Sequence, residues 1–224
     1  MKKYFLAFLL MLLCGFGFSQ QIELSGGYCN NHYYDFSKEA YPGSYSNYEP
    51  GDGYMAGITI SGIRLLSPSK VDTHFVELSF KLINYKGTVD MSIDGSHFGN
   101  GRLNTKIEKM ILSLGIYPLN LKIYKGFRWS LGMEVGVLVH SEEEIIENYS
   151  PWFPPGSAAP EPQIEYTKVN LGMGNRFLYE INVDQHWYLV PDYIFYLGFI
   201  PESSGNLAVF SYRHYLNFGV GRRF

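Results

Sequence analysis

The sequence predicts an all-β fold: an eight-stranded antiparallel up-and-down transmembrane β-barrel with a polar, filled interior. Three observations predict it. Apolar and polar side chains alternate with a period of two residues along eight segments, the polar positions of these segments are rich in glycine, and long connections alternate with short ones. A period of two is the mark of a strand, because successive side chains of a strand point to opposite faces.

Before the first strand, the chain begins with a segment typical of a secretory signal peptide. Met1, Lys2 and Lys3 form a positive start, residues 4–13 are apolar, and Ser19 and Gln20 follow at the expected cleavage site. The apolar run is shorter than the roughly 20 residues of a membrane-spanning helix. Leu13 precedes Cys14 where a lipoprotein signal needs a small residue. We therefore expect a signal peptide at 1–20 and one barrel domain at 21–224.

The composition excludes several classes of function. The whole chain carries a net charge of −3, and loss of Lys2 and Lys3 with the leader makes the mature chain more acidic. No basic stripe that could hold a phosphate backbone is present, so we expect no nucleic-acid partner. Cys29 is the cysteine that remains after cleavage, so no intramolecular disulfide is expected. No zinc pattern, phosphate loop or cofactor fingerprint was found, and we expect no cofactor.

The clearest strand covers residues 127–139. Its odd positions are all apolar, from Phe127 and Trp129 to Val139, whereas its even positions carry Gly, Ser, Arg and Glu with a single Leu. The other seven segments show the same alternation. Their apolar positions, in chain order, are Ile22, Leu24 and Tyr28; Tyr54, Ala56, Ile58 and Ile60; Val76, Leu78, Phe80 and Leu82; Met110, Leu112, Leu114 and Ile116; Val169, Leu171, Met173 and Phe177; Trp187, Leu189, Tyr193, Phe195 and Leu197; Leu216, Phe218, Val220 and Phe224.

Glycine on the polar face indicates which face is inside. Gly is a poor residue for a water-exposed strand face. It suits the interior of a narrow barrel, where eight strands leave a lumen just wide enough for side chains to fill. The polar-face glycines are Gly57, Gly115, Gly132, Gly136, Gly172, Gly174, Gly219 and Gly221. The sequence therefore predicts apolar side chains outside and polar side chains inside, as in an outer-membrane barrel.

The connections support the same topology. Short links are expected on the periplasmic side at 64–72, 118–125 and 180–185, and longer loops on the external side at 30–53, 86–105 and 140–164, with a short one at 201–207. Short turns on one side and long loops on the other are typical of outer-membrane barrels. An aromatic girdle is expected at the periplasmic rim, made of Tyr117, Trp129, Tyr179, Trp187 and Phe224.

The leader ending Phe18-Ser19-Gln20, the eight alternating segments and the terminal Gly219-Val220-Gly221-Arg222-Arg223-Phe224 resemble the small outer-membrane β-barrel proteins of the Bacteroidetes, which are similar in architecture to the OmpA/OmpX type. The resemblance implies a location in the outer membrane of a Gram-negative bacterium, among lipid and lipopolysaccharide. It also implies recognition by the barrel-assembly machinery through the last strand and its aromatic Phe224. It implies no activity.

Charged residues of both signs are expected in the lumen: Glu77, Lys81, Lys109, Arg128, Glu134, Arg176, Asp192 and Arg213. Because an unpaired buried charge costs several kcal/mol, opposite signs should meet. Similar heights on neighbouring strands predict two ion pairs, Glu134 with Lys109 and Asp192 with Arg176. We interpret these charges as a plugged polar core; the alternative is a path for protons or ions.

Aromatic residues in the external loops are the candidate recognition surface. Tyr and Trp offer large contact areas at low entropic cost. Packing of these rings on one another and on lipopolysaccharide is an equal alternative. The residues are Tyr33, Tyr34, Tyr41, Tyr45, Trp152 and Phe153.

An acidic cluster follows His140, comprising Glu142, Glu143, Glu144 and Glu147. A solvated acidic loop is favoured over a cation site, because no EF-hand spacing is present. Catalysis is not expected either. His140 and Ser141, or Ser211 and His214, have opposite strand parity, whereas a nucleophile and its base must lie within hydrogen-bonding reach.

The sequence therefore predicts a non-enzymatic outer-membrane barrel that acts through long aromatic loops in adhesion, partner binding or envelope structure. A first alternative is an accessory subunit of a larger outer-membrane secretion or transport complex. A second is a lipid A-modifying enzyme, and a small channel comes last.

Overall fold

The computed structural model describes residues 21–35, 44–64, 75–95, 99–149, 165–204 and 209–224. The expected signal peptide at 1–20 lies outside these ranges and stays a prediction. The described residues form strands and turns, with no α-helix among them. Accordingly, the described part of the chain contains no helix that is long and apolar enough to cross a membrane.

Eight long strands form a closed antiparallel barrel, as the sequence predicts. Each strand pairs with the next along the chain, and β12 pairs with both β10 and β1, which closes the cylinder. The strands are β1 (Gln21–Asp35), β3 (Gly51–Arg64), β4 (Phe75–Gly95), β5 (Gly99–Tyr124), β6 (Phe127–Tyr149), β8 (Val169–Tyr179), β10 (Trp187–Gly198) and β12 (Val209–Arg223). The predicted fold class is confirmed.

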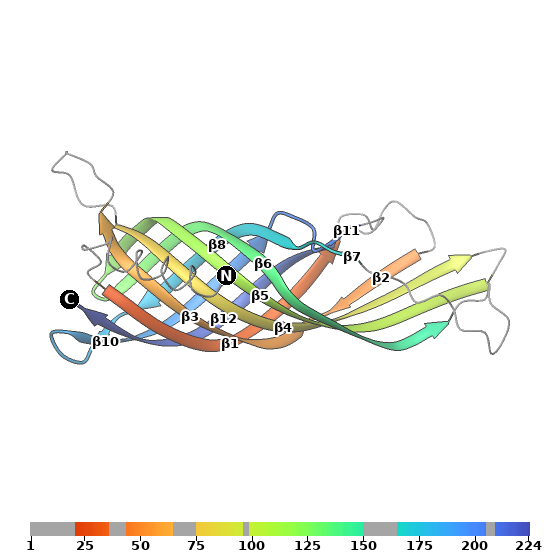
Figure 1. Ribbon diagram of the computed structural model, residues 1–224, viewed down its shortest axis with the longest axis horizontal. Coiled ribbons are helices and arrows are strands. Elements are labelled where there is room, and N and C mark those ends of the chain that lie inside the picture. Colours follow the sequence, from red (N-terminus) through yellow and green to blue (C-terminus); the bar gives the residue numbers. More distant parts are fainter. Residues whose placement is uncertain (1–20, 36–43, 65–74, 96–98, 150–164, 205–208) are drawn as a thin grey trace, which may run out of the picture.

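Four short strands complete the structure. They are β2 (Ser44–Glu49), β7 (Glu165–Tyr166), β9 (Ile181–Asn182) and β11 (Ser203–Ser204). Strand β1 begins and β12 ends at the same end of the barrel, which we call the termini end; β4, β5 and β6 run far beyond the opposite end, the ribbon end (Figure 1).

The two faces of the barrel are oriented as the alternation predicts. On β6, Met133, Val135 and Val137 are 43–49% exposed, whereas Glu134 between them is 1% exposed. Large apolar side chains are exposed on the outer face of the other barrel strands too, for example Leu24, Ile58, Leu112 and Phe218. Apolar outside and polar inside is the reverse of a water-soluble barrel, and it sets what the outer surface can contact.

Glycines on the inner face make room for tyrosine rings. A Cβ added at Gly221 would overlap the ring of Tyr188, and one at Gly172 would overlap the ring of Tyr196. Tyr188 and Tyr196 are both buried in the lumen. The small and large inner residues are therefore matched across neighbouring strands, as a narrow filled barrel requires.

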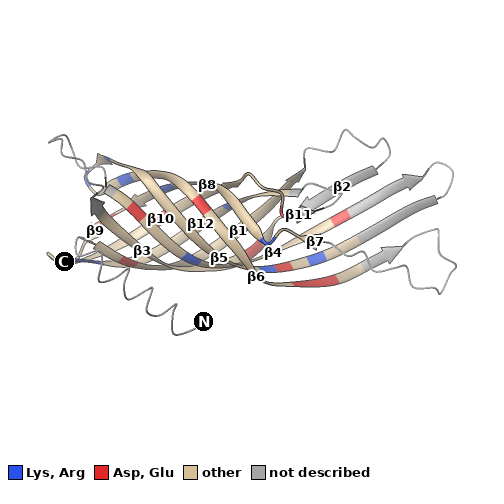
Figure 2. Ribbon diagram, turned by 45° about the horizontal axis from the view of Figure 1, so that its top comes forward, with Lys and Arg blue, Asp and Glu red and all other residues tan. Residues whose placement is uncertain are grey.

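Beyond the barrel, β4, β5 and β6 continue as a protruding sheet, and β2 pairs with β4 at its edge. We call this extension the ribbon: β2, β4 from Lys86, β5 up to Glu108 and β6 from His140. Charged positions gather along it (Figure 2). The expectation that 86–105 and 140–149 are loops is therefore wrong for the residues described there. On β4 and β5 the ribbon residues Val89, Thr105 and Ile107 are buried, whereas the residues of β6 from His140 to Ile146 are exposed. The acidic run of β6 lacks the apolar alternation that reveals the barrel strands.

Two further corrections concern β5 near the termini end. The link expected at 118–125 is strand up to Tyr124, and the turn is Lys125–Gly126, where Gly126 has a positive φ of 76°. A shift between Ile116 and Leu119 bends β5 just before this turn. Tyr117, which was expected in the aromatic girdle, is buried in the lumen instead. Tyr179, Trp187 and Phe224 are exposed on the outside at the termini end, as a girdle requires.

Candidate functional site

The lumen is the part of the chain where most buried charges meet. Three clusters of charged side chains fill it, separated by apolar and tyrosine side chains. We name them after their central residues: the Arg176 cluster nearest the termini end, the Glu134 cluster in the middle, and the Glu202 cluster at the ribbon end.

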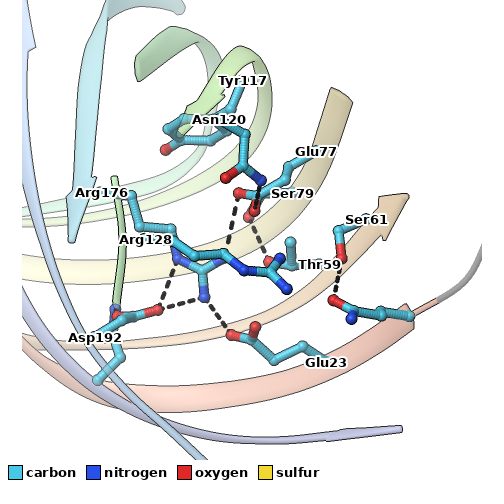
Figure 3. Close-up of polar contacts among 12 residues, drawn as sticks. Glu23, Thr59, Ser61, Glu77, Ser79, Tyr117, Asn120, Arg128, Arg176 and Asp192 are labelled. Atoms are coloured by element: carbon cyan, nitrogen blue, oxygen red, sulfur yellow. Dashed lines mark hydrogen bonds and ion pairs between the residues drawn. The ribbon is translucent and has the colours of Figure 1, made fainter. Parts of the chain in front are cut away.

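In the Arg176 cluster, one guanidinium holds three carboxylates (Figure 3). Arg176 lies 2.6 Å from Asp192 and 3.5 Å from Glu77, and it also pairs with Glu23. Asn217 donates to Asp192 at 2.6 Å, and Asn120 donates to Glu77 at 2.6 Å. Strands β1, β4, β8 and β10 are thus tied together across the lumen by one side chain.

The Glu134 cluster joins three neighbouring strands. The Nζ atom of Lys81 on β4 lies 2.5 Å from Glu134 on β6 and donates to the hydroxyl of Tyr117 on β5 at 3.0 Å. Tyr117 itself donates to the carboxylate of Glu134. All three side chains are buried. Lys81 and Glu134 therefore form a buried, hydrogen-bonded ion pair that fills the middle of the lumen with matched charge.

The Glu202 cluster closes the ribbon end of the lumen. Glu202 follows β10 and turns back into the barrel, where four side chains donate to its carboxylate: Lys109 and Tyr85, each at 2.8 Å, together with Arg213 and Ser211. Burial alone would raise the pKa of Glu202, but the charges of Lys109 and Arg213 outweigh burial and hold this pKa well below its usual range.

A small two-stranded sheet lies over this cluster and forms a lid. Ser203 and Ser204 of β11 pair with Tyr166 and Glu165 of β7. The amide of Thr167 donates to the carbonyl of Glu202 at 3.0 Å. The ring centroid of Tyr166 lies 4.2 Å from Lys109 Nζ. The connection after β6 and the connection after β10 are therefore joined over the mouth and pinned by one buried carboxylate.

Of the two ion pairs expected from the sequence, the structure contains the pair between Asp192 and Arg176. The pair between Glu134 and Lys109 is not formed, because Glu134 pairs with Lys81 and Lys109 pairs with Glu202. The burial of Glu202 in the lumen was not expected from the sequence, because a residue that follows a strand is expected in an external loop. The signal was an imbalance: the charges expected in the lumen comprise five cations and only three carboxylates.

The candidate recognition surface is only partly described. Tyr33 is buried in β1 and lies near Lys109, so its assignment to an exposed loop is wrong. Tyr34 is half-buried, and its hydroxyl donates to the carbonyl of Gly198 at 3.0 Å. Tyr45 lies in β2, and its side chain is outside the description. Tyr41, Trp152 and Phe153 also fall outside the described residues.

The catalytic alternatives are not assembled. Ser211 points into the lumen towards Glu202, whereas His214 lies on the outer face, where its Nδ1 is 2.6 Å from the hydroxyl of Tyr193. On the ribbon, His140 contacts Glu142 at 2.9 Å on a solvent-exposed surface. The acidic residues 142–144 are strand residues of β6, not loop residues. No group of three or more metal-ligating side chains occurs among the residues that the structure describes.

A second concave region lies at the termini end. It is a cavity of about 500 Å³ lined by Lys122, Lys125, Gly126, Arg128, Tyr179, Glu180, Ile181, Asn182 and Arg223. Glu180 bridges two arginines, with Arg128 at 2.7 Å and Arg223 at 2.8 Å. Buried Leu178, Tyr188 and Val190 form an apolar cluster next to it in the lumen. We call this cavity the vestibule.

Known proteins similar to this chain are found among solved structures. No family model matches it, and no curated protein matches it by sequence. Solved structures similar to it include the outer membrane protein OprG from Pseudomonas aeruginosa, which is 11% identical with a TM-score of 0.46 over 92% of this chain and 98% of OprG. Neisserial surface protein A is 12% identical, with a TM-score of 0.43 over 91% and 97% of the two chains.

Ail, the attachment invasion locus protein of Yersinia pestis, was solved with the heparin analogue sucrose octasulfate. It is 10% identical to this chain, with a TM-score of 0.38 over 92% and 99% of the two chains. The strand pairing of this chain itself establishes the barrel fold.

Proposed function

We propose that this chain is a non-enzymatic outer-membrane β-barrel protein that acts through its ribbon end. The observation that carries the proposal is the orientation of the side chains, with apolar residues outside and paired charges inside. Outer-membrane lipid and lipopolysaccharide are then the contacts of the outer face. The bacterial group suggested by the sequence stays a prediction.

The length of the apolar belt supports a membrane-spanning role. Outward-facing apolar residues run along β6 from Trp129 to Val139 and along β10 from Trp187 to Leu197. A tilted strand needs roughly 9–11 residues to cross the hydrocarbon. At the ribbon end the outer face becomes polar, with Asp52 accepting from Asn30 at 3.0 Å and Lys86 lying 3.2 Å from Glu108. At the termini end, Trp187 and Phe224 lie on the outside beside Arg222.

We infer that the termini end lies in the periplasm and the ribbon outside the cell. The turn Lys125–Gly126 is tight and the link between β8 and β10 is short, which suits the periplasmic side. Among the residues that the structure describes, two sheet edges of the ribbon then have no strand partner, the outer edge of β2 and that of β6 beyond Val139. Unpaired strand edges are templates for pairing with another chain. We therefore infer that adhesion, partner binding or envelope structure depends on the ribbon.

A trimmed ribbon tests this proposal. The variant replaces residues 89–105 by Asn-Gly, which joins Thr88 to Lys106, two residues that already face each other. A two-residue Asn-Gly turn closes an antiparallel pair without strain. The barrel should fold, which heat-modifiable migration on a denaturing gel would verify. In a strain lacking the gene, the full chain should restore surface attachment and resistance to detergent, and the trimmed chain should not.

Full complementation by the trimmed chain would remove the ribbon from the account. Single-channel recording adds an independent test, because a lumen filled by three charge clusters should pass no steady current in planar bilayers. Steady ion flow through the full chain would instead favour a channel.

A further inference from the structure

We propose that the vestibule at the termini end binds small ligands that carry phosphate groups. This inference is independent of what the ribbon binds. It starts from the charges around the cavity: Lys122, Lys125, Arg128 and Arg223 contribute four cations, against the single carboxylate of Glu180. The vestibule therefore has an excess of three positive charges in a chain whose net charge is −3.

Glu180 neutralises only part of this charge. Its two oxygens are shared between Arg128 and Arg223, one oxygen for each guanidinium. Each guanidinium has five N–H donors, so most of these donors remain for another acceptor. Lys122 and Lys125 are exposed and have no carboxylate within ion-pair distance among the residues described. The cavity thus presents two guanidinium groups and two exposed ammonium groups to the solvent.

Arg128 and Arg223 lie on the inner side of the barrel wall, away from lipid. Lys122 pairs with Arg128 across β5 and β6, and Arg128 in turn faces Leu178, which is buried in the lumen. Arg128 projects into the interior on the same side as Arg176 (Figure 3). Arg223 covers the ring of the buried Tyr188 at 4.5 Å. A ligand must therefore enter through the mouth from the aqueous phase.

Charge and size favour phosphate over other anions. A phosphate monoester carries about −1.5 to −2 charges at pH 7 and three strong acceptor oxygens. Arginine recognises phosphate with two parallel hydrogen bonds, and lysine adds a point charge. The volume of about 500 Å³ fits a small molecule and not an extended macromolecular surface. Leu178 and Tyr188 lie beside Arg128 and Arg223 and form a buried apolar cluster with Val190 on the lumen side of these cations.

Calorimetric titration with sodium pyrophosphate tests the proposal. The protein is used as the full mature chain in zwitterionic-detergent micelles at low ionic strength. The variant K122A/K125A removes two exposed lysines that make no ion pair in the described structure. The matched control K86A/K106A removes two exposed lysines of the ribbon and changes the net charge equally. Heat-modifiable migration verifies the fold of each variant.

The wild-type chain and K86A/K106A should bind pyrophosphate equally, and K122A/K125A should bind it at least tenfold more weakly. Acetate should bind the wild-type chain at least tenfold more weakly than pyrophosphate does. Absence of pyrophosphate binding, equal affinity in the two double variants, or equal affinity for acetate would overturn the proposal.

The source of the phosphate is tested in nanodiscs. Pyrophosphate should bind with the same affinity whether the disc contains phosphatidylcholine alone or a mixture with phosphatidylglycerol, because the vestibule opens to water. Loss of pyrophosphate binding in phosphatidylglycerol discs would show that lipid headgroups occupy the cations, and it would overturn the assignment of an aqueous ligand.

Discussion

At the scale of the residue, the lumen depends on a few side chains that serve several partners. Arg176 is the clearest case, because three carboxylates from three strands rely on its charge. Its own exposed fraction is 3%. Removing one partner of a buried ion pair strongly lowers the free energy of unfolding, because the opposite charges remain buried without compensation.

The substitution Arg176→Ala should therefore lower the free energy of unfolding by about 3–5 kcal/mol, since Glu23, Glu77 and Asp192 would be left close together. The matched control is Arg222→Ala, because Arg222 is exposed on the outer rim and rests on Trp187 and Phe224. This control should cost less than about 1 kcal/mol. Urea titration of both variants in lipid vesicles measures the difference, and equal losses would contradict the account.

A glycine and a ring form a second dependent pair. Gly221→Ala should cost about 1–3 kcal/mol, because the new methyl group overlaps the ring of Tyr188. In a Tyr188→Ala background the same change should be nearly neutral, so a double-mutant cycle should give a coupling of about 1 kcal/mol or more. Gly26→Ala is the control, since a Cβ there makes an ordinary contact of 3.5 Å. An additive cycle would show that steric matching does not set the choice of glycine.

At the scale of the element, the lid is held mainly by Glu202. A carboxylate whose pKa is depressed in the folded state contributes stability above its unfolded pKa of about 4.3, and this contribution is lost as the pH falls through the folded pKa. The pKa of Glu202 lies well below its usual range, so the lid should stay closed at mildly acidic pH and open only in stronger acid.

Hydrogen exchange of the Thr167 amide measures how often the lid opens. Its protection factor should stay constant between about pH 7 and pH 4.5 and fall at lower pH. Glu202→Gln removes the charge, and it should lower the protection at neutral pH by about tenfold or more, which corresponds to the loss of a charge-assisted hydrogen bond. Protection that is unchanged in this variant would show that β7 and β11 hold the lid without Glu202.

The ribbon shows which elements the sequence does not reveal. The barrel strands could be predicted from their period of two, because one face of each strand carries polar or charged residues and the other face carries apolar residues. Residues 140–149 pair just as regularly, but their acidic run 142–144 puts polar residues on both faces of β6. Residues 86–95 do alternate, with Val89, Met91 and Ile93 between polar residues, and they continue a barrel strand instead of forming a loop. Bulges add a second difficulty. The shift between Met110 and Ile111 admits the extra residue Val139 on β6, and beyond it the inner and outer parities of β6 are exchanged.

At the scale of the whole molecule, the closed barrel, its strand order and the orientation of its faces could all be predicted from the sequence. The contents of the lumen could be predicted only as a set of charges. Partner choice depends on the height of each side chain, which shear and bulges alter, so Lys109 meets Glu202 instead of Glu134. Glu202 could not be placed because connections carry no periodic signal. The vestibule could not be predicted from the sequence, because its lining residues come from separate strands that meet only around the folded turn at Gly126.

The central claim is that the apolar outer face contacts hydrocarbon. Spin labels on single cysteines at Leu112, Val135 and Phe218, in a chain with Cys29→Ser and reconstituted into liposomes, test it most directly. Collision rates with oxygen should be high and those with a water-soluble nickel chelate low at all three sites, whereas His140 on the ribbon should show the reverse. High accessibility of Leu112, Val135 and Phe218 to the nickel chelate would contradict the account, because water would then cover the face that is assigned to lipid.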